Sequence, residues 1–386
     1  MTVRVLLNIG FRPFYLLGAI FAVVAMAAWL VVFTGMANFG GDLPSVFWHS
    51  HEMVFGFSMA VMTGFLFTAV RNWTGQPTPS GWALGAIAAV WVAARILLVA
   101  GPASIGVILD VLFLPLVTIS IAIPVFRSRN QRNYKVVALV AALAILHFVY
   151  HLALSGGLSA TWSRPALFTA IDVFVILFAV VGGRVIPAFT KNAVPGSNPV
   201  HQTWVEVSAF GLLLMLGVTT LARGGFALPA GQTALLALLA AAAHSLRLAL
   251  WQPGRTLGQP LLWMMPVAYS WLPLALVLRG LAGLGIVVPG AWIHALTVGG
   301  LTSLMVAMMM RSTLGHTGRE LKASRVDLIA FLLLQLGAIV RVLSGIVGDH
   351  RTMTILAGLI WMAAFAAFLV RYTPMLLRPR ADGRPG

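Results

Sequence analysis

Cysteine is absent from this 386-residue sequence, and charged residues make up only 9% of it. The missing thiols exclude disulfides, thiolate metal ligands and cysteine-held iron–sulfur clusters. Any bound metal must therefore use histidine, methionine, aspartate, glutamate or tyrosine side chains. Acidic side chains are the scarcest charged group, with nine Asp and Glu residues against 25 Lys and Arg. So few charges do not suit the water-facing surface of a soluble protein of this length.

Apolar residues make up 60% of the sequence, and the mean hydropathy is +0.96. They form repeated runs of about 20 residues, the length that crosses a bilayer as a helix. We predict an all-α polytopic membrane protein with a single transmembrane domain over residues 1–386. Twelve spans are expected at residues 14–35, 49–70, 82–100, 105–126, 135–155, 165–187, 203–221, 232–251, 261–279, 289–311, 326–346 and 353–373.

The basic residues indicate the orientation of the spans. The net charge is +16, but Lys and Arg fall between the apolar runs and form no soluble patch, so nucleic acid is not an expected partner. With twelve spans, most of the basic loops and both termini lie on one side. The positive-inside rule makes that side cytoplasmic, with lipid around the spans.

The most informative polar side chains stand at the outer ends of three predicted spans. Five histidines and one glutamate share this layer: His49, His51, Glu52, His147, His151 and His294. Ionisable groups at membrane depth are costly and therefore usually functional, and histidine is the commonest ligand for transition metals. Each histidine alone suits a hydrogen-bonded interfacial side chain better than a ligand, but five at one depth favour ligands, and we predict that these histidines bind metal or cofactor.

Spacing separates these histidines into sets. His147 and His151 are four residues apart and share a helix face, so both can point at one centre. His49 and His51 are two residues apart and cannot share a face if both are helical. A haem needs one or two axial ligands and a copper ion favours about three imidazoles, so five histidines are enough for both. Glu52 is expected to act as a proton donor or relay, or to orient a ligand histidine.

Several other polar residues have two interpretations. His244, in the eighth span, is a weaker candidate for binding a second cofactor, and its alternative role is packing. Asp110 and Asp172 are membrane-located carboxylates for which ion pairs are expected, with Arg95 and Arg341 as partners. Loop histidines are expected to be solvated; they are His201, His316 and His350.

The chain also contains a candidate internal repeat. His51, Asp172 and His294 lie about 120 residues apart, and each is followed about 24 residues later by a glycine. Three four-helix pseudo-repeats are predicted, at about 14–126, 135–251 and 261–373. The alternative is that glycine simply recurs at helix ends. Twelve spans in three repeats resemble the catalytic subunit of haem–copper oxidases, an architectural analogy that does not establish function.

Six strings occur in order along nearly the whole chain. They are Gly10-Phe11-Arg12-Pro13-Phe14, Trp48-His49-Ser50-His51-Glu52-Met53, Asn72-Trp73-Thr74-Gly75, Gly183-Arg184-Val185-Ile186-Pro187, His294-Ala295-Leu296-Thr297-Val298-Gly299 and Leu314-Gly315-His316-Thr317-Gly318-Arg319. Together they resemble the NnrS family of bacterial membrane proteins associated with the response to nitric oxide. The resemblance implies haem b and copper as cofactors, with the outer-layer histidines as their ligands, and binding of nitric oxide or another small gas.

The resemblance also implies protection against nitrosative stress. It leaves open whether the protein reduces nitric oxide, with quinol as an expected electron donor and Glu52 as the expected proton donor. One departure concerns Pro266, which stands where the family pattern often has histidine. If that histidine helps to bind a cofactor near His244, this chain lacks the cofactor or replaces the ligand.

Two other functions fit the same sequence. Twelve spans with internal repeats suit a transporter for a metal ion, haem or a small anion. Prolines within spans also occur in the broken helices of transporters, although neighbouring helices tolerate such kinks. The third alternative is a scaffold or stress-protection protein without turnover.

Overall fold

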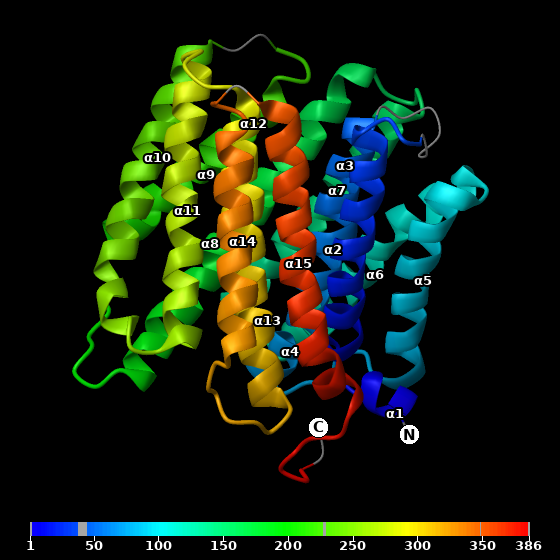
Figure 1. Ribbon diagram of the computed structural model, residues 1–386, viewed down its shortest axis with the longest axis vertical. Coiled ribbons are helices and arrows are strands. Elements are labelled where there is room, and N and C mark those ends of the chain that lie inside the picture. The colour runs from blue at the N-terminus through cyan, green and yellow to red at the C-terminus, as the bar shows by residue number, and fades with distance from the viewer. Residues whose placement is uncertain (1, 38–44, 227–228, 348, 385–386) are drawn as a thin grey trace. The chain divides into compact units, whose positions relative to one another are not determined.

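The computed structural model describes residues 2–37, 45–226, 229–347 and 349–384 (Figure 1). These residues are helical apart from short connections, and the described part contains no β-strand. Within the same residues, twelve helical segments are long and apolar enough to cross a membrane. The predicted all-α class and the predicted number of spans are both confirmed.

The α-helices are α1 (Thr2–Leu6), α2 (Phe11–Phe33), α3 (Ser45–His51), α4 (Met59–Thr74), α5 (Gly81–Ala100), α6 (Ala103–Arg127), α7 (Tyr134–Leu154), α8 (Ser163–Ala193), α9 (Thr203–Ala222), α10 (Ala230–Leu250), α11 (Pro260–Gly283), α12 (Pro289–His294), α13 (Ser303–His316), α14 (Arg325–Leu343) and α15 (His350–Leu377). Two π-helices, η1 (Glu52–Ser58) and η5 (Ala295–Thr302), join α3 to α4 and α12 to α13. Short 3₁₀ turns are η2 (Gln131–Asn133), η3 (Ala160–Trp162) and η4 (Pro253–Thr256).

Some helices are longer than their apolar runs. The sixth span covers Ala160–Ala193, whereas the sequence predicts 165–187. The helix continues past Arg184 to Lys191 because main-chain hydrogen bonds hold it regardless of side-chain polarity. An apolar run therefore marks the segment that suits the bilayer, and not the ends of the helix.

The chain forms two compact units. Unit 1 comprises Met1–Ala170, Ser312–Glu320 and Phe365–Gly386, and unit 2 comprises Ile171–Arg311 and Leu321–Ala364. The single domain and the three pseudo-repeats stay predictions.

In unit 1, α2 packs against η1 and α4, while α6 packs against α4, α5 and α7. Glycines allow the close approach of α2 to α4. A Cβ added at Gly18 would lie 2.8 Å from Val61 Cγ2, and one at Gly64 would lie 2.9 Å from Phe14 Cβ. Larger residues at either position would push these two helices apart.

The two ends of the chain meet in unit 1. The Arg12 side chain is 1% exposed and donates hydrogen bonds to the main-chain oxygens of Leu376 and Arg378, both at 2.8 Å. The start of α2 is therefore tied to the end of α15, and the N- and C-termini lie at the same end of unit 1 (Figure 1).

In unit 2, α10 packs against α9 and α11, and α11 packs against α12 and η5. A buried ion pair links Asp172 to Arg279, with Nη1 2.5 Å from Oδ1 and Nη2 3.1 Å from Oδ2. Thr220 donates to the same carboxylate at 2.7 Å, and the guanidinium lies 4.7 Å from the centre of the Trp292 ring. The predicted ion pairing of Asp172 is confirmed, but naming Arg341 as its partner was wrong.

Each unit contains one of the π-helices, and each π-helix begins directly after a histidine. η1 follows His51 and η5 follows His294. The extra residue per turn in a π-helix widens the helix locally, and such segments are frequent at functional sites. Hydropathy patterns do not distinguish this geometry from an ordinary α-helix, so the sequence did not predict either segment.

Candidate metal centre

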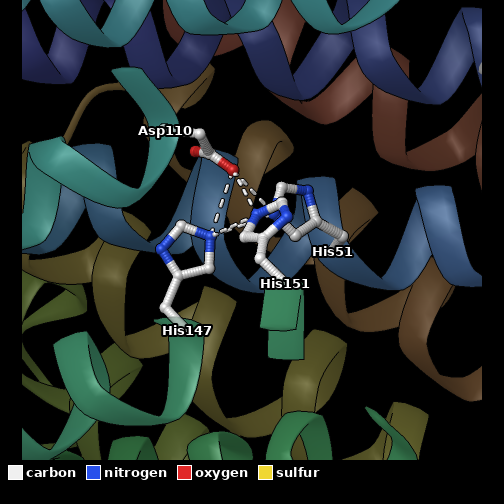
Figure 2. Close-up of side chains that lie close together, drawn as sticks. All are labelled: His51, Asp110, His147 and His151. Carbon is white, nitrogen blue, oxygen red and sulfur yellow. Dashed lines mark hydrogen bonds and ion pairs between the residues drawn. The ribbon is translucent and has the colours of Figure 1, made fainter. Parts of the chain in front are cut away.

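Three histidines and one aspartate of unit 1 converge on a single point (Figure 2). His51 ends α3, Asp110 lies on α6, and His147 and His151 lie one turn apart on α7. One ligand atom from each residue lies within 4.8 Å of the other three. The i, i+4 spacing on α7 thus directs both imidazoles at one centre, as the sequence predicts.

The donor atoms are close enough to share one ion. Asp110 Oδ2 lies 2.9 Å from the Nε2 atoms of His51 and His151 and 3.1 Å from that of His147. The His147 Nε2 lies 3.1 Å from its counterpart in His51 and 3.2 Å from that in His151. A tetrahedral ion with ligands at about 2.0–2.1 Å keeps them about 3.3 Å apart, so a metal ion fits after a small outward movement.

The site is buried between aromatic rings. His51, Asp110 and His147 are 4%, 2% and 1% exposed, and His151 is half-buried. Phe55 stacks on the His147 ring with a centroid distance of 4.1 Å, and Tyr150 stacks on His51 at 5.5 Å. These rings limit the access of water and fix the planes of two imidazoles. The ligand geometry is therefore set by packing as well as by hydrogen bonds.

Glu52 and Arg95 form a second layer around these ligands. His51 Nδ1 donates to Glu52 Oε1 at 3.1 Å, and Arg95 Nη1 donates to Glu52 Oε2 at 2.7 Å. The other terminal nitrogen of Arg95 donates to Asp110 Oδ1. This confirms the predicted Arg95–Asp110 ion pair. Because Nδ1 of His51 faces a carboxylate, its Nε2 is directed to the centre as the ligand atom.

Charge favours a cation at the centre. Two carboxylates, Glu52 and Asp110, share one guanidinium, Arg95, and all three side chains are buried. One negative charge is thus left over in a region of low dielectric constant, where an unbalanced charge is costly. Three neutral imidazole nitrogens and a carboxylate oxygen form a donor set that suits a transition-metal ion. The residues present therefore fit a metal, both in geometry and in charge.

The other predicted site residues lie elsewhere. His49 also belongs to α3, but its ring stacks on Trp29 at a centroid distance of 4.5 Å and does not join the group. The two-residue spacing from His51 explains this, since it turns the side chains to different faces. His294 belongs to unit 2, where its Nδ1 lies 2.7 Å from the Gly290 carbonyl oxygen. The ligand roles of His49 and His294 stay predictions.

His244 lies fully buried on α10 of unit 2, in a different hydrogen-bond network. Its Nδ1 is 2.8 Å from the Tyr269 hydroxyl, which accepts a hydrogen bond from Arg247 at 2.7 Å. Arg247 also holds Glu206 through two bonds of 2.7 and 2.8 Å. Pro266 lies buried on α11, three residues before Tyr269. This network joins α9, α10 and α11, and the weaker prediction that His244 binds a second cofactor stays a prediction.

The sequence did not predict that Asp110 belongs to the metal centre. Its position in the outer half of a span predicts an ion pair with Arg95, but not a contact with three histidines. The sequence does predict the depth of Asp110 in the membrane, because this residue is expected in the same half as the histidine layer. Depth does not say which face of α6 meets α7.

Comparison with known protein families gives a match. The family described as "NnrS protein" matches residues 5–380, almost the entire chain. A comparison with curated proteins finds no match.

Proposed function

Since the chain belongs to the NnrS family, we propose that it is a haem- and copper-containing membrane protein that binds nitric oxide. In this proposal the copper ion is held by His51, Asp110, His147 and His151. The observation that carries the proposal is the convergence of four donor atoms, three from buried residues and one from the half-buried His151, within 4.8 Å of one another. The family resemblance supports haem b, copper and nitric oxide.

The donor set is compatible with copper, and the family resemblance favours copper over other transition metals. Imidazole suits copper, zinc and iron, whereas sites for magnesium and calcium are built from oxygen atoms. A bound copper ion would supply a redox-active centre that accepts a small diatomic ligand. Glu52 and Arg95 orient His51 and Asp110 toward this ion, and Phe55 and Tyr150 keep bulk water away from it. The protein thus contributes a preformed and largely dry binding site.

The proposal includes a place in the cell and a source of electrons. Both termini are cytoplasmic in a bacterial inner membrane, where the protein protects against nitrosative stress. Reductive turnover, if it occurs, joins two nitric oxide molecules with two electrons and two protons to give nitrous oxide and water. Quinol from the surrounding bilayer is the proposed electron donor. The sequence has no cysteine for the covalent attachment of haem c, and the family resemblance supports haem b.

Metal analysis of the detergent-purified protein tests the proposal. We expect one copper ion per wild-type chain. We expect the ion to be lost in His147→Ala and in His151→Ala, and His151 is the half-buried member of the group. His49→Ala is the matched control, because His49 lies two residues from His51 and outside the group. Full copper content in both α7 variants would contradict the proposed site. Readily exchanged metal, with uptake into proteoliposomes, would support the transporter alternative instead.

A further inference from the structure

The chain after α15 folds back onto the end of α13 (Figure 1). The Ala381 main-chain nitrogen donates to the Thr317 carbonyl oxygen at 2.9 Å, and Arg380 Nη1 donates to that of His316 at 3.1 Å. Both contacts lie within unit 1. The segment that follows α15 is therefore held against the end of α13.

This contact brings arginine side chains together. Arg319 Nη1 donates at 3.2 Å to the Thr317 carbonyl oxygen, the same oxygen that accepts from Ala381. From α2, Arg12 Nη1 donates at 2.8 Å to the carbonyl oxygen of Arg378, the residue directly after α15. Electrostatic repulsion connects the members of one arginine cluster, which comprises Arg12, Arg319, Arg371, Arg378 and Arg380.

Several positive charges of the arginine cluster lack a carboxylate partner. Asp382 pairs with Arg380, with Oδ2 2.6 Å from Nη2. Arg12 and Arg319 donate to main-chain carbonyl oxygens, which carry no net charge. Arg378 is exposed, and within the described part of the chain its side chain forms no hydrogen bond or ion pair. Three charges, those of Arg12, Arg319 and Arg378, are thus left without a carboxylate among the described residues.

Such an excess of positive charge favours an anion. Burial, followed by the charges of Arg378 and Arg371, lowers the pKa of Arg319, because like charges disfavour the charged form. A guanidinium binds phosphate through two parallel N–H donors, which makes arginine well suited to this anion. Arg12 is the second residue of α2 and Arg378 directly follows α15. The cluster therefore lies at the ends of two candidate spans, the depth at which the headgroups of a bilayer are expected.

One face of α15 provides a surface for the rest of a lipid. Ala366, Val370 and Pro374 precede Arg378 at intervals of four residues, and all four residues are exposed. Residues four apart lie on one face of a helix. An acyl chain that packs along the three apolar side chains would place its headgroup at Arg378. A free phosphate ion would gain nothing from this apolar face, so the arrangement favours a lipid.

We propose that Arg319 and Arg378 bind the phosphate group of an anionic phospholipid at this end of unit 1. Arg12 is buried beneath them, where it holds the chain after α15 and adds its positive charge. Basic side chains at the cytoplasmic ends of membrane helices commonly recognise anionic headgroups. A lipid with no net charge carries its own cation and is expected to bind more weakly. The inference goes beyond the proposed function and requires no metal or haem.

Native mass spectrometry of the detergent-purified protein, titrated with phosphatidylglycerol or phosphatidylcholine, tests the inference. We expect the wild type to bind phosphatidylglycerol more tightly, and Arg378→Gln to weaken that binding about 5-fold, the usual effect of one arginine near a membrane surface. The double variant Arg319→Gln/Arg378→Gln should lose the preference. Arg127→Gln is the matched control, because Arg127 is an exposed arginine of unit 1 at the end of α6, on the side predicted to be cytoplasmic. We expect it to match the wild type.

Three results would overturn the inference. Equal binding of the two lipids by the wild type would refute a site for an anionic headgroup. Equal losses in Arg378→Gln and Arg127→Gln would show a general effect of charge and no site at the arginine cluster. Displacement of phosphatidylglycerol by an equal concentration of inorganic phosphate would assign the cluster to a free phosphate ion. Thermal unfolding checks that the variants are folded, and Arg378→Gln should match the wild type because it breaks no contact within the described residues.

Discussion

At the scale of single residues, the site depends on a short chain of charged contacts. Arg95 holds Glu52 and Asp110, and Glu52 accepts a hydrogen bond from Nδ1 of His51. The His51 ring is therefore oriented through Nδ1, with Nε2 2.9 Å from Asp110 Oδ2, before any metal binds. A change in Glu52 should act through the orientation of His51 and not by removing a ligand.

Glu52→Gln is expected to weaken copper binding about 10- to 100-fold, the usual cost of removing a hydrogen-bond partner of a ligand histidine. The amide retains an acceptor for His51 but loses the charge that pairs with Arg95. Titration against a chromophoric copper chelator measures the affinity. Glu320→Gln, an exposed carboxylate outside the site, is the control. An unchanged affinity in Glu52→Gln would argue that Glu52 has no orienting role.

The buried pair of unit 2 gives a stability prediction. Removing the charge of Arg279 by Arg279→Met leaves Asp172 buried without its cation, which should cost about 3–5 kcal/mol. Adding Asp172→Asn to this variant should recover part of the loss, because the unpaired charge is then gone. Thermal unfolding in detergent measures both effects. Equal stability of the wild type and Arg279→Met would show that the pair does not stabilise the fold.

The sequence predicted three of the four residues in the candidate metal centre. His147 and His151 follow from helical spacing, and His51 follows from its place at the end of a span. The arrangement of Asp110, Arg95 and Glu52 could not be predicted from the sequence, because it depends on which faces of α5, α6 and η1 contact one another. Contacts between residues distant in sequence are not encoded in a local periodicity.

At the scale of elements, the spans were predictable and the π-helices were not. An apolar run of bilayer length is a strong and local signal. A hydropathy pattern carries no such signal for a π-helix. In η5, Gly299 packs closely against the Trp271 ring of α11, a contact between residues distant in sequence.

Gly299→Ala tests that packing. The added methyl group would collide with the Trp271 ring, whereas at Gly300 the nearest heavy atom lies 3.7 Å from the new carbon. We expect Gly299→Ala to destabilise the protein by about 1–3 kcal/mol, the usual cost of overpacking. Gly300→Ala is the adjacent control and should change the melting temperature much less. Equal effects at both positions would contradict the close packing of Trp271 on Gly299.

At the scale of the whole molecule, an even number of spans predicts that both termini lie on one side of the membrane. The contact of Arg12 with the end of α15 agrees with this prediction within unit 1. The excess of Lys and Arg in the loops of that side predicts that it is cytoplasmic.

The absence of cysteine allows a direct test of this orientation. A single cysteine introduced by Arg384→Cys should resist a membrane-impermeant maleimide in intact spheroplasts and react after permeabilisation. Gly157→Cys, in the connection after α7 that is predicted to face outward, should react without permeabilisation. The reverse pattern would invert the topology and place the histidine layer on the cytoplasmic side.

X-ray absorption at the copper edge of the purified protein tests the central claim most directly, because it reports the ligands of the bound ion. The account predicts three imidazoles and one further oxygen donor, with no sulfur. His151→Ala should lose one imidazole, and His49→Ala should give the wild-type spectrum. Sulfur from methionine in the first coordination shell, or an imidazole signal that is unchanged in His151→Ala, would contradict a copper site built from His51, Asp110, His147 and His151.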